Sequence, residues 1–106
     1  MSTQVGQTIL QQLGGNRFRT MTGAASFSAG EFPEGPGLSM KLPGGKGMII
    51  TLNGRDLYDL KLLRSGFFRK DEFIPMKVTR ECLNVGVEQL RDTFTEMTGL
   101  YTSLAA

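Results

Sequence analysis

Apolar residues recur every four positions at the start of the chain, which places one hydrophobic stripe on a single helix face. They are Val5, Ile9 and Leu13. Gly14-Gly15 follows at once and supplies the left-handed residue that commonly ends a helix. The pattern predicts a short N-terminal helix within residues 1–15.

Alternation of apolar and polar residues replaces this spacing further along the chain and predicts strands with one buried face. The predicted strands cover residues 25–28, 38–42, 48–52, 56–63 and 73–78. Asn53-Gly54 between two of them predicts a hairpin with a type I′ turn. Pro75 cannot donate to a ladder, so the last strand is expected at a sheet edge. Phe18 and Met21 fit either a loop or one helical turn.

The last segment carries an apolar residue at alternating spacings of four and three, the repeat of one helix face. These seam residues are Leu83, Val87, Leu90, Phe94, Met97, Tyr101 and Leu104. The helix is expected within residues 79–106, ending at Gly99 or continuing through it. Its stripe either packs on the chain's own sheet or also forms a homodimer seam.

The expected fold is therefore α+β: a short helix, an antiparallel meander of four or five strands, and an amphipathic C-terminal helix packed on the sheet. Residues 1–106 form one domain, because a chain of this length usually buries a single core. Within it we expect the first helix in 1–15, the sheet in 16–78 and the last helix in 79–106. We expect no internal repeat.

The absence of histidine, and the presence of one cysteine, Cys82, exclude several kinds of chemistry. No imidazole base exists, no set of residues forms a convincing metal site, and no internal disulfide can form. We therefore expect no enzyme, no metal and no cofactor. No apolar run approaches the roughly 18 residues of a membrane span, so a cytoplasmic protein without a membrane partner is expected.

Charge is distributed unevenly, although the net charge is only +2. Residues 1–80 hold 11 of the 12 basic residues and six of the ten acids, a net of +5, and the remainder has a net of −3. Cationic residues with interleaved aromatic residues are typical of surfaces that bind single-stranded nucleic acid. The expected phosphate contacts are Arg17, Arg19, Lys41, Lys61, Arg64, Arg69 and Lys70, and the expected stacking residues are Tyr58 and Phe67. The alternative is that these charged residues only keep the protein soluble.

Lys41 and Lys61 each alternate with apolar neighbours in a predicted strand, so both are expected on the wet face of the sheet. That face is therefore expected to be cationic. The loop Gly44-Gly45-Lys46-Gly47 lacks the following Ser or Thr and the helix of a phosphate-binding loop. It is interpreted as a hairpin loop, with contact to a backbone phosphate as the alternative.

Both ends of the chain resemble a family of small uncharacterised proteins from bacteriophages and other bacterial mobile elements. The matching segments are TILQQLGGNRF at residues 8–18, MTGA at 21–24, ITLN at 50–53 and FTEMTGLYTSL at 94–104. This resemblance implies no catalytic residues. The order of a meander and one helix is also similar to the PC4-like single-stranded DNA-binding fold, which implies dimerisation through the helix, although the additional N-terminal helix departs from that fold.

These patterns together favour a non-enzymatic phage or mobile-element protein that binds single-stranded nucleic acid through a cationic sheet face, as a homodimer. The alternative is a phage-encoded interaction module that inhibits or adapts a host protein through an exposed edge strand or the acidic helix face.

Overall fold

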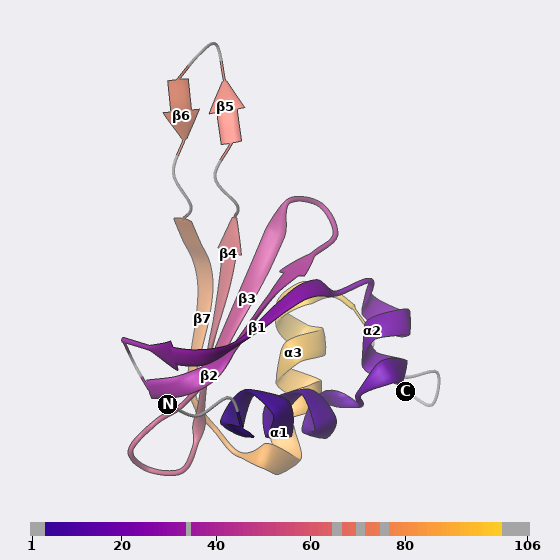
Figure 1. The fold of residues 1–106 in the computed structure, drawn as a ribbon, viewed down its shortest axis with the longest axis vertical. Coiled ribbons are helices and arrows are strands. Elements are labelled where there is room, and N and C mark those ends of the chain that lie inside the picture. Colours follow the sequence, from indigo (N-terminus) through magenta and orange to yellow (C-terminus); the bar gives the residue numbers. More distant parts are fainter. Residues whose placement is uncertain (1–3, 34, 65–66, 70–71, 75–76, 101–106) are drawn as a thin grey trace.

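The computed structural model describes residues 4–33, 35–64, 67–69, 72–74 and 77–100. It has two layers, an antiparallel sheet and three helices that cover one face of it (Figure 1). The helices are α1 (Gln4–Leu13), α2 (Asn16–Thr22) and α3 (Leu90–Thr98), with a 3₁₀ turn η1 at Val87–Gln89. The sheet contains β1 (Ala25–Phe32), β2 (Gly35–Leu42), β3 (Lys46–Leu52), β4 (Tyr58–Arg64) and β7 (Lys77–Val85). The predicted α+β class and the five-stranded meander are confirmed.

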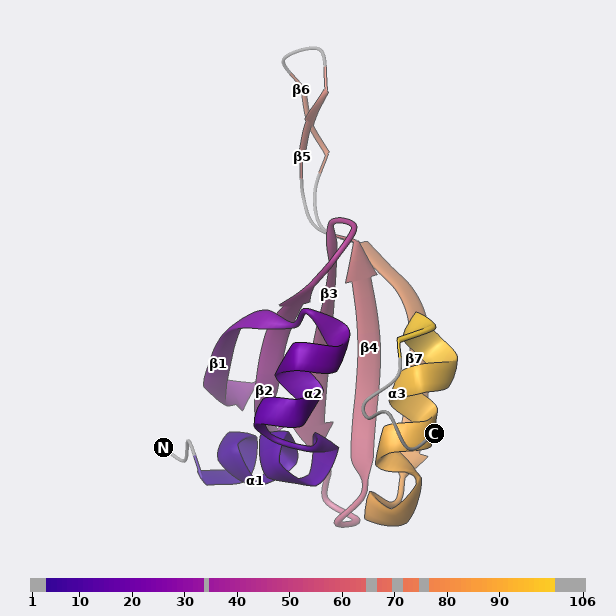
Figure 2. The same ribbon diagram turned by 90° about the vertical axis from the view of Figure 1, so that its right-hand side faces the viewer.

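A second, two-stranded sheet joins β4 to β7. It consists of β5 (Phe67–Arg69) and β6 (Glu72–Ile74), which pair with each other in an antiparallel hairpin. Figures 1 and 2 show that this hairpin projects from the end of the main sheet, away from the helices. Pro75 lies outside the described residues, and the strand expected over 73–78 divides between β6 and β7.

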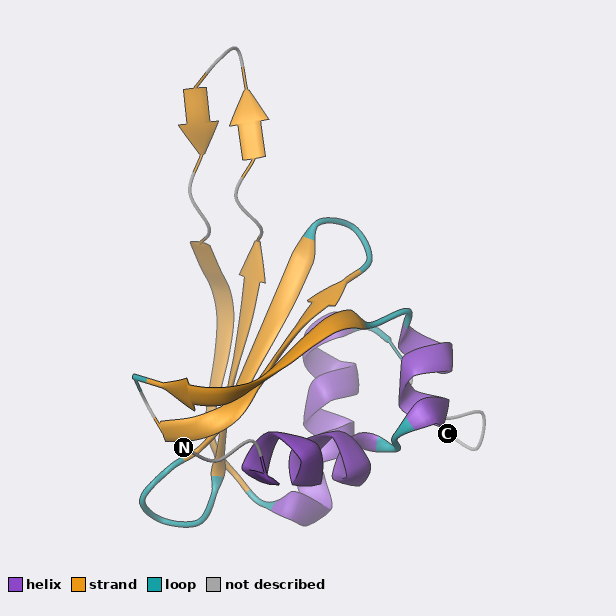
Figure 3. Ribbon diagram, in the orientation of Figure 1, coloured by secondary structure: helices purple, strands orange, loops and turns teal. Residues whose placement is uncertain are grey.

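Facing residues of neighbouring strands build the core on the helical side. Met40, Met48 and Leu62 are partners across β2, β3 and β4, and all three are buried. Partner residues in an antiparallel pair point to the same face, so each such row forms one layer of the core. Helix α1 covers β1, β2 and β3, whereas α3 covers β4 and β7 (Figure 2). The opposite face of the sheet, which we call the outer face, carries no helix (Figure 3).

The two N-terminal helices pack closely on this layer. The predicted α1 is confirmed: Ile9 and Leu13 are fully buried, and the helix is followed by Gly15 at φ 60°. The irregular segment that follows it forms α2, whose Phe18 is also fully buried. Of the two interpretations of Phe18 and Met21, a loop or a helical turn, the helical one is therefore confirmed.

The boundary of the last helix was wrong. Strand β7 runs from Lys77 to Val85 and α3 begins only at Leu90, so residue 79 lies inside a strand and not at the start of a helix. Residues 77–85 satisfy the backbone groups along the free edge of β4, which a helix would leave unpaired. The seven-residue seam is divided accordingly. Leu90, Phe94 and Met97 are buried against the chain's own core, Leu83 and Val87 are exposed by 51% and 47%, and Tyr101 and Leu104 lie outside the described residues.

The turn between β3 and β4 also differs from the prediction. It is wider than a two-residue type I′ turn, because the Asn53 N–H donates to the Leu57 carbonyl at 2.8 Å. The Asn53 side-chain oxygen accepts the Arg55 and Leu57 N–H groups at 2.8 and 3.3 Å. The positive φ of 59° falls at Asp56. A side chain that replaces backbone hydrogen bonds therefore shapes this turn.

Helices α2 and α3 end in the same six-residue pattern, F-x-x-M-T-G, at residues 18–23 and 94–99. In each copy the threonine hydroxyl donates to the phenylalanine carbonyl, at 2.7 and 2.8 Å, and the glycine adopts the left-handed conformation. The two phenylalanine rings pack edge to face with centroids 5.0 Å apart. This short repeat was missed, and it joins the two helices at the centre of the core.

Candidate functional site

The outer face holds Lys41 and Lys61, as the alternation predicted. Lys61 is the partner of Ile49 on one side and of Glu81 on the other, and its Nζ lies 3.9 Å from Glu81 Oε2. Asp59 lies two residues before Lys61 and shares its face. Two carboxylates thus accompany two lysines on this face. The charges there largely balance, which weakens the expected cationic sheet face.

The arginines of α2 lie elsewhere. Arg17 and Arg19 are exposed on a helix that covers the other side of the sheet (Figure 2). The Arg19 guanidinium carbon lies 5.0 Å from the centroid of the Phe27 ring, a cation–π arrangement. The sheet separates these arginines from Lys41 and Lys61, so the structure does not bring the two groups together.

Tyr58 cannot be a stacking surface in this fold. Its side chain is 6% exposed within the core, and its hydroxyl donates to Gln12 Oε1 at 2.6 Å. Phe67 begins β5 and Arg69 ends it, but their side chains are not among those described, and Lys70 lies outside the described residues.

Burial raises the pKa of Tyr58 above its ordinary value of 10.0, while the hydrogen bond with Gln12 acts in the opposite direction. The folded state therefore holds the phenol proton more tightly than the unfolded state. This contribution to stability is complete below about pH 10 and is lost as pH rises through the folded-state pKa.

Tyr58→Phe should therefore flatten the alkaline loss of stability. Between about pH 9 and 11, the unfolding free energy of the variant should fall less steeply than that of the wild type. At pH 7 the variant should be about 1 kcal/mol less stable, because the hydrogen bond with Gln12 is lost. Urea unfolding at a series of pH values measures both effects. If the unfolding free energies of wild type and variant fell in parallel with pH, the raised pKa of Tyr58 would be contradicted.

A row of three cations crosses one end of the sheet, where β4 ends and β3 and β7 begin. Figure 1 shows that the β5–β6 hairpin projects from this end. Lys46 of β3 is the partner of Arg64 of β4, which is the partner of Lys77 of β7. Neighbouring strands lie about 4.8 Å apart, so this register places three cationic residues side by side in space. A row of like charges attracts anions.

Arg80 adds a fourth cation near this row, and it was missed as a candidate because residue 80 was expected in a helix. It is the partner of Leu62 on the helical side of the sheet. Its Nη1 donates to the carbonyls of Glu96 and Met97 at 3.3 and 3.4 Å. A guanidinium at this position complements the negative end of α3. We call Lys46, Arg64, Lys77 and Arg80 the cationic sheet end.

A hollow of about 440 Å³, which we call the sheet-end hollow, opens beside these residues. Three of the four cations line it, and the described lining residues include no carboxylate. The full described lining is Gly44, Lys46, Leu62, Leu63, Arg64, Thr79, Arg80 and Met97. It therefore combines positive charge with apolar wall and one hydroxyl group.

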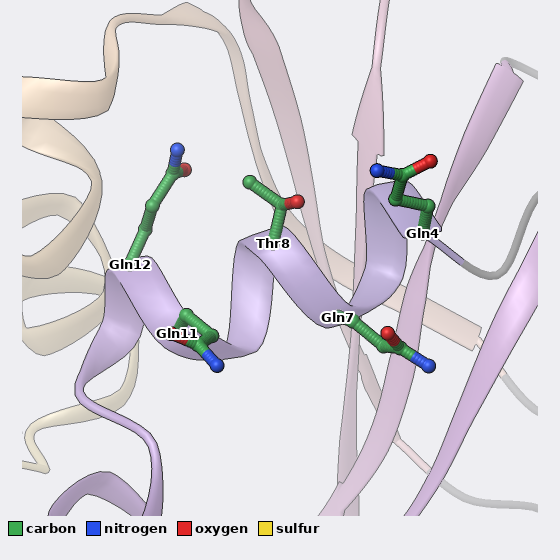
Figure 4. A pocket seen from close by; sticks show the side chains of 5 residues that line it. All are labelled: Gln4, Gln7, Thr8, Gln11 and Gln12. Atoms are coloured by element: carbon green, nitrogen blue, oxygen red, sulfur yellow. The ribbon is translucent and has the colours of Figure 1, made fainter.

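A second hollow, of about 410 Å³, follows the polar side of α1 (Figure 4). Its lining consists of uncharged residues: Gln4, Gln7, Thr8, Gln11 and Gln12. Figure 4 shows Gln4, Thr8 and Gln12 projecting from one side of the helix and Gln7 and Gln11 from the other. Amides and a hydroxyl form hydrogen bonds but supply no charge and no acid or base near neutral pH. The sheet-end hollow is therefore the better candidate.

Other chemistry finds little support among the described residues. They contain no group of three or more acidic or cysteine side chains placed to hold a metal ion. Cys82 is a half-buried free thiol packed against the core. Among the described helices, none is long and apolar enough to cross a membrane.

Comparison with known proteins adds no relative to this picture. The chain matches no protein-family model, no curated protein and no solved structure.

Proposed function

We propose that the protein is a non-enzymatic module that binds single-stranded nucleic acid through the cationic sheet end. The observation that carries this proposal is the row formed by Lys46, Arg64 and Lys77 on three neighbouring strands. Lysine and arginine bind nucleic acid by displacing counterions from phosphates, and a compact row of them favours a phosphate backbone over a neutral ligand. The proposal moves the interface from the outer face to the end of the sheet.

The β5–β6 hairpin extends the same region. Phe67 begins β5 three residues after Arg64, and Arg69 ends that strand. A stacking residue and a further phosphate contact from the predicted set therefore follow the cationic sheet end directly along the chain. An aromatic residue that follows a cationic row along the chain favours a single strand as the ligand, because unpaired bases can stack on aromatic rings.

A fluorescence-anisotropy titration with a labelled single-stranded oligonucleotide tests the proposal. Binding should be measurable at about 50 mM salt and should weaken as salt rises, because each phosphate contact contributes roughly −0.7 to the slope of log K against log salt. Three contacts from the row correspond to a slope near −2. Undetectable binding at low salt would refute the proposal, because phosphate-driven affinity is greatest there.

A protein-interaction module is the second candidate, and the edge of the sheet favours it. Strand β7 has no partner on its outer side among the described strands. Its large apolar side chains Val78 and Leu83 are 46% and 51% exposed, and Val87 just beyond the strand is 47% exposed. Exposed apolar groups on an unpaired edge can receive a strand from another chain.

A pull-down from nuclease-treated bacterial lysate separates the two candidates. Retention of a partner by the wild type but not by Leu83→Glu would favour the interaction module. The homodimer and the phage or mobile-element origin also remain proposals. Because α3 buries its seam residues in its own core, a dimer would use the β7 edge, and light scattering should then give twice the 11.6 kDa chain mass.

A further inference from the structure

We infer that the sheet-end hollow binds one nucleotide, with its phosphate on the cationic side and its base against the apolar wall. This inference rests on the proposed function and names the unit of nucleic acid that the site would recognise. The hollow would hold a single nucleotide, and the row of cations would contact the phosphate backbone of the strand.

Charge makes one side of the hollow suitable for a phosphate. Lys46 and Arg64 come from facing positions of β3 and β4, so the fold holds their side chains on the same face. Gly44, in the turn that precedes β3, also lines the hollow at a φ of 81°, with no atom within 4 Å of the place a side chain would occupy. A phosphate can therefore approach both cationic side chains and the backbone of the turn.

Arg80 removes the main obstacle to an anion at this place. Helix α3 ends beside the hollow, and the carbonyl end of a helix carries partial negative charge that repels anions. Arg80 binds the Glu96 and Met97 carbonyls and also lines the hollow. Its role is to position the wall and to cancel that negative charge, and Lys46 and Arg64 remain the phosphate contacts.

The apolar part of the lining fits a base. Leu62 and Met97 are 4% and 6% exposed, so they form a firm apolar surface rather than mobile side chains. A methionine sulfur makes favourable contacts with aromatic rings. The Thr79 hydroxyl donates to the Leu62 carbonyl at 3.2 Å and can accept a hydrogen bond from a base edge. The volume of about 440 Å³ lies within the range of small-ligand pockets and suits one nucleotide.

An NMR titration of the full chain tests this inference with three probes: adenosine 5′-monophosphate, adenosine and inorganic phosphate. The monophosphate should bind at least about 10-fold more tightly than either other probe, because only it uses both walls. The amide signals of Gly44, Lys46 and Thr79 should shift most. Equal binding of phosphate and monophosphate, or shifts elsewhere on the chain, would overturn the inference.

Variants locate the effect. Thr79→Leu should reduce the affinity for the monophosphate about 10-fold by filling the hollow, whereas Thr20→Leu, at an exposed position of α2, should not change it. Lys46→Gln should also weaken binding, and Lys41→Gln, an exposed lysine of the same hairpin, is its control. Unchanged affinity in both hollow variants, with the fold retained, would overturn the inference.

An oligonucleotide with a 5′-hydroxyl separates this inference from the proposed function. If it binds while the monophosphate causes no shifts, the nucleotide site is refuted and the proposed function stands. If neither binds, both fail. Where the monophosphate binds, the two strands can be compared as competitors for its site. Stronger competition by the 5′-phosphorylated strand identifies the strand end as the ligand, and equal competition by both strands identifies an internal nucleotide. Either result supports the nucleotide site.

Discussion

Replacing Phe94 with alanine should lower the free energy of unfolding by about 3–5 kcal/mol. Phe94 is fully buried, and its ring packs edge to face on Phe18 with centroids 5.0 Å apart. The substitution removes apolar area and leaves a cavity where α2, α3 and the sheet meet. For a domain of this size the melting temperature should fall by at least about 12 °C.

Leu83→Ala is the matched control, because the sequence placed both residues in one apolar seam. Leu83 is 51% exposed on β7, so its truncation should change stability by less than about 0.5 kcal/mol. Thermal and urea unfolding measure both variants. Equal losses of stability would mean that the segment from 83 to 97 forms the continuous helix that the sequence predicted.

Gly37→Ala should destabilise the protein by about 3 kcal/mol, the upper range for overpacking. A Cβ on Gly37 would overlap the Ile50 carbonyl oxygen of β3 and lie 2.8 Å from the Thr51 Cα. These are backbone atoms in the middle of the sheet, so they cannot turn aside as a side chain can. The Gly37 carbonyl also lies 2.7 Å from the position of a Cβ on Gly6, so displacement of β2 would disturb the packing of α1 as well.

Gly30→Ala on the neighbouring strand β1 is the control for this substitution. No atom lies within 4 Å of a Cβ at Gly30, and its φ is not in the left-handed region. Its stability should stay within about 0.5 kcal/mol of the wild type. Urea unfolding compares the two, and equal stability of both variants would contradict the close approach of β2 and β3.

Local pattern was sufficient to predict most of the fold. Alternation located β2, β3 and β4, since each has one buried and one wetter face. It failed after residue 78 because the spacing from Leu83 through Met97 matches one helix face, while the backbone of β4 needs a pairing partner there. Such a requirement depends on the neighbouring strand and leaves no mark in the spacing of residues 77–85.

The candidate site was harder to predict than the fold. The faces of Lys41 and Lys61 followed correctly from alternation, but the nearby Glu81 depends on how β4 and β7 align. The row of Lys46, Arg64 and Lys77 joins residues up to 31 positions apart and exists only through strand register. Of the three members only Arg64 was among the expected phosphate contacts, and the spacing of basic residues along the chain could not show that the three meet.

The most direct test of the cationic sheet end compares two double variants in the same anisotropy titration with a single-stranded oligonucleotide. Lys46→Gln with Lys77→Gln removes two members of the row, and Lys41→Gln with Lys61→Gln removes the same charge from the outer face. The first should weaken binding at least about 10-fold and reduce the salt slope by roughly 1.4, whereas the second should stay within about threefold of the wild type. Equal losses, or a larger loss in the outer-face variant, would contradict the location of the site.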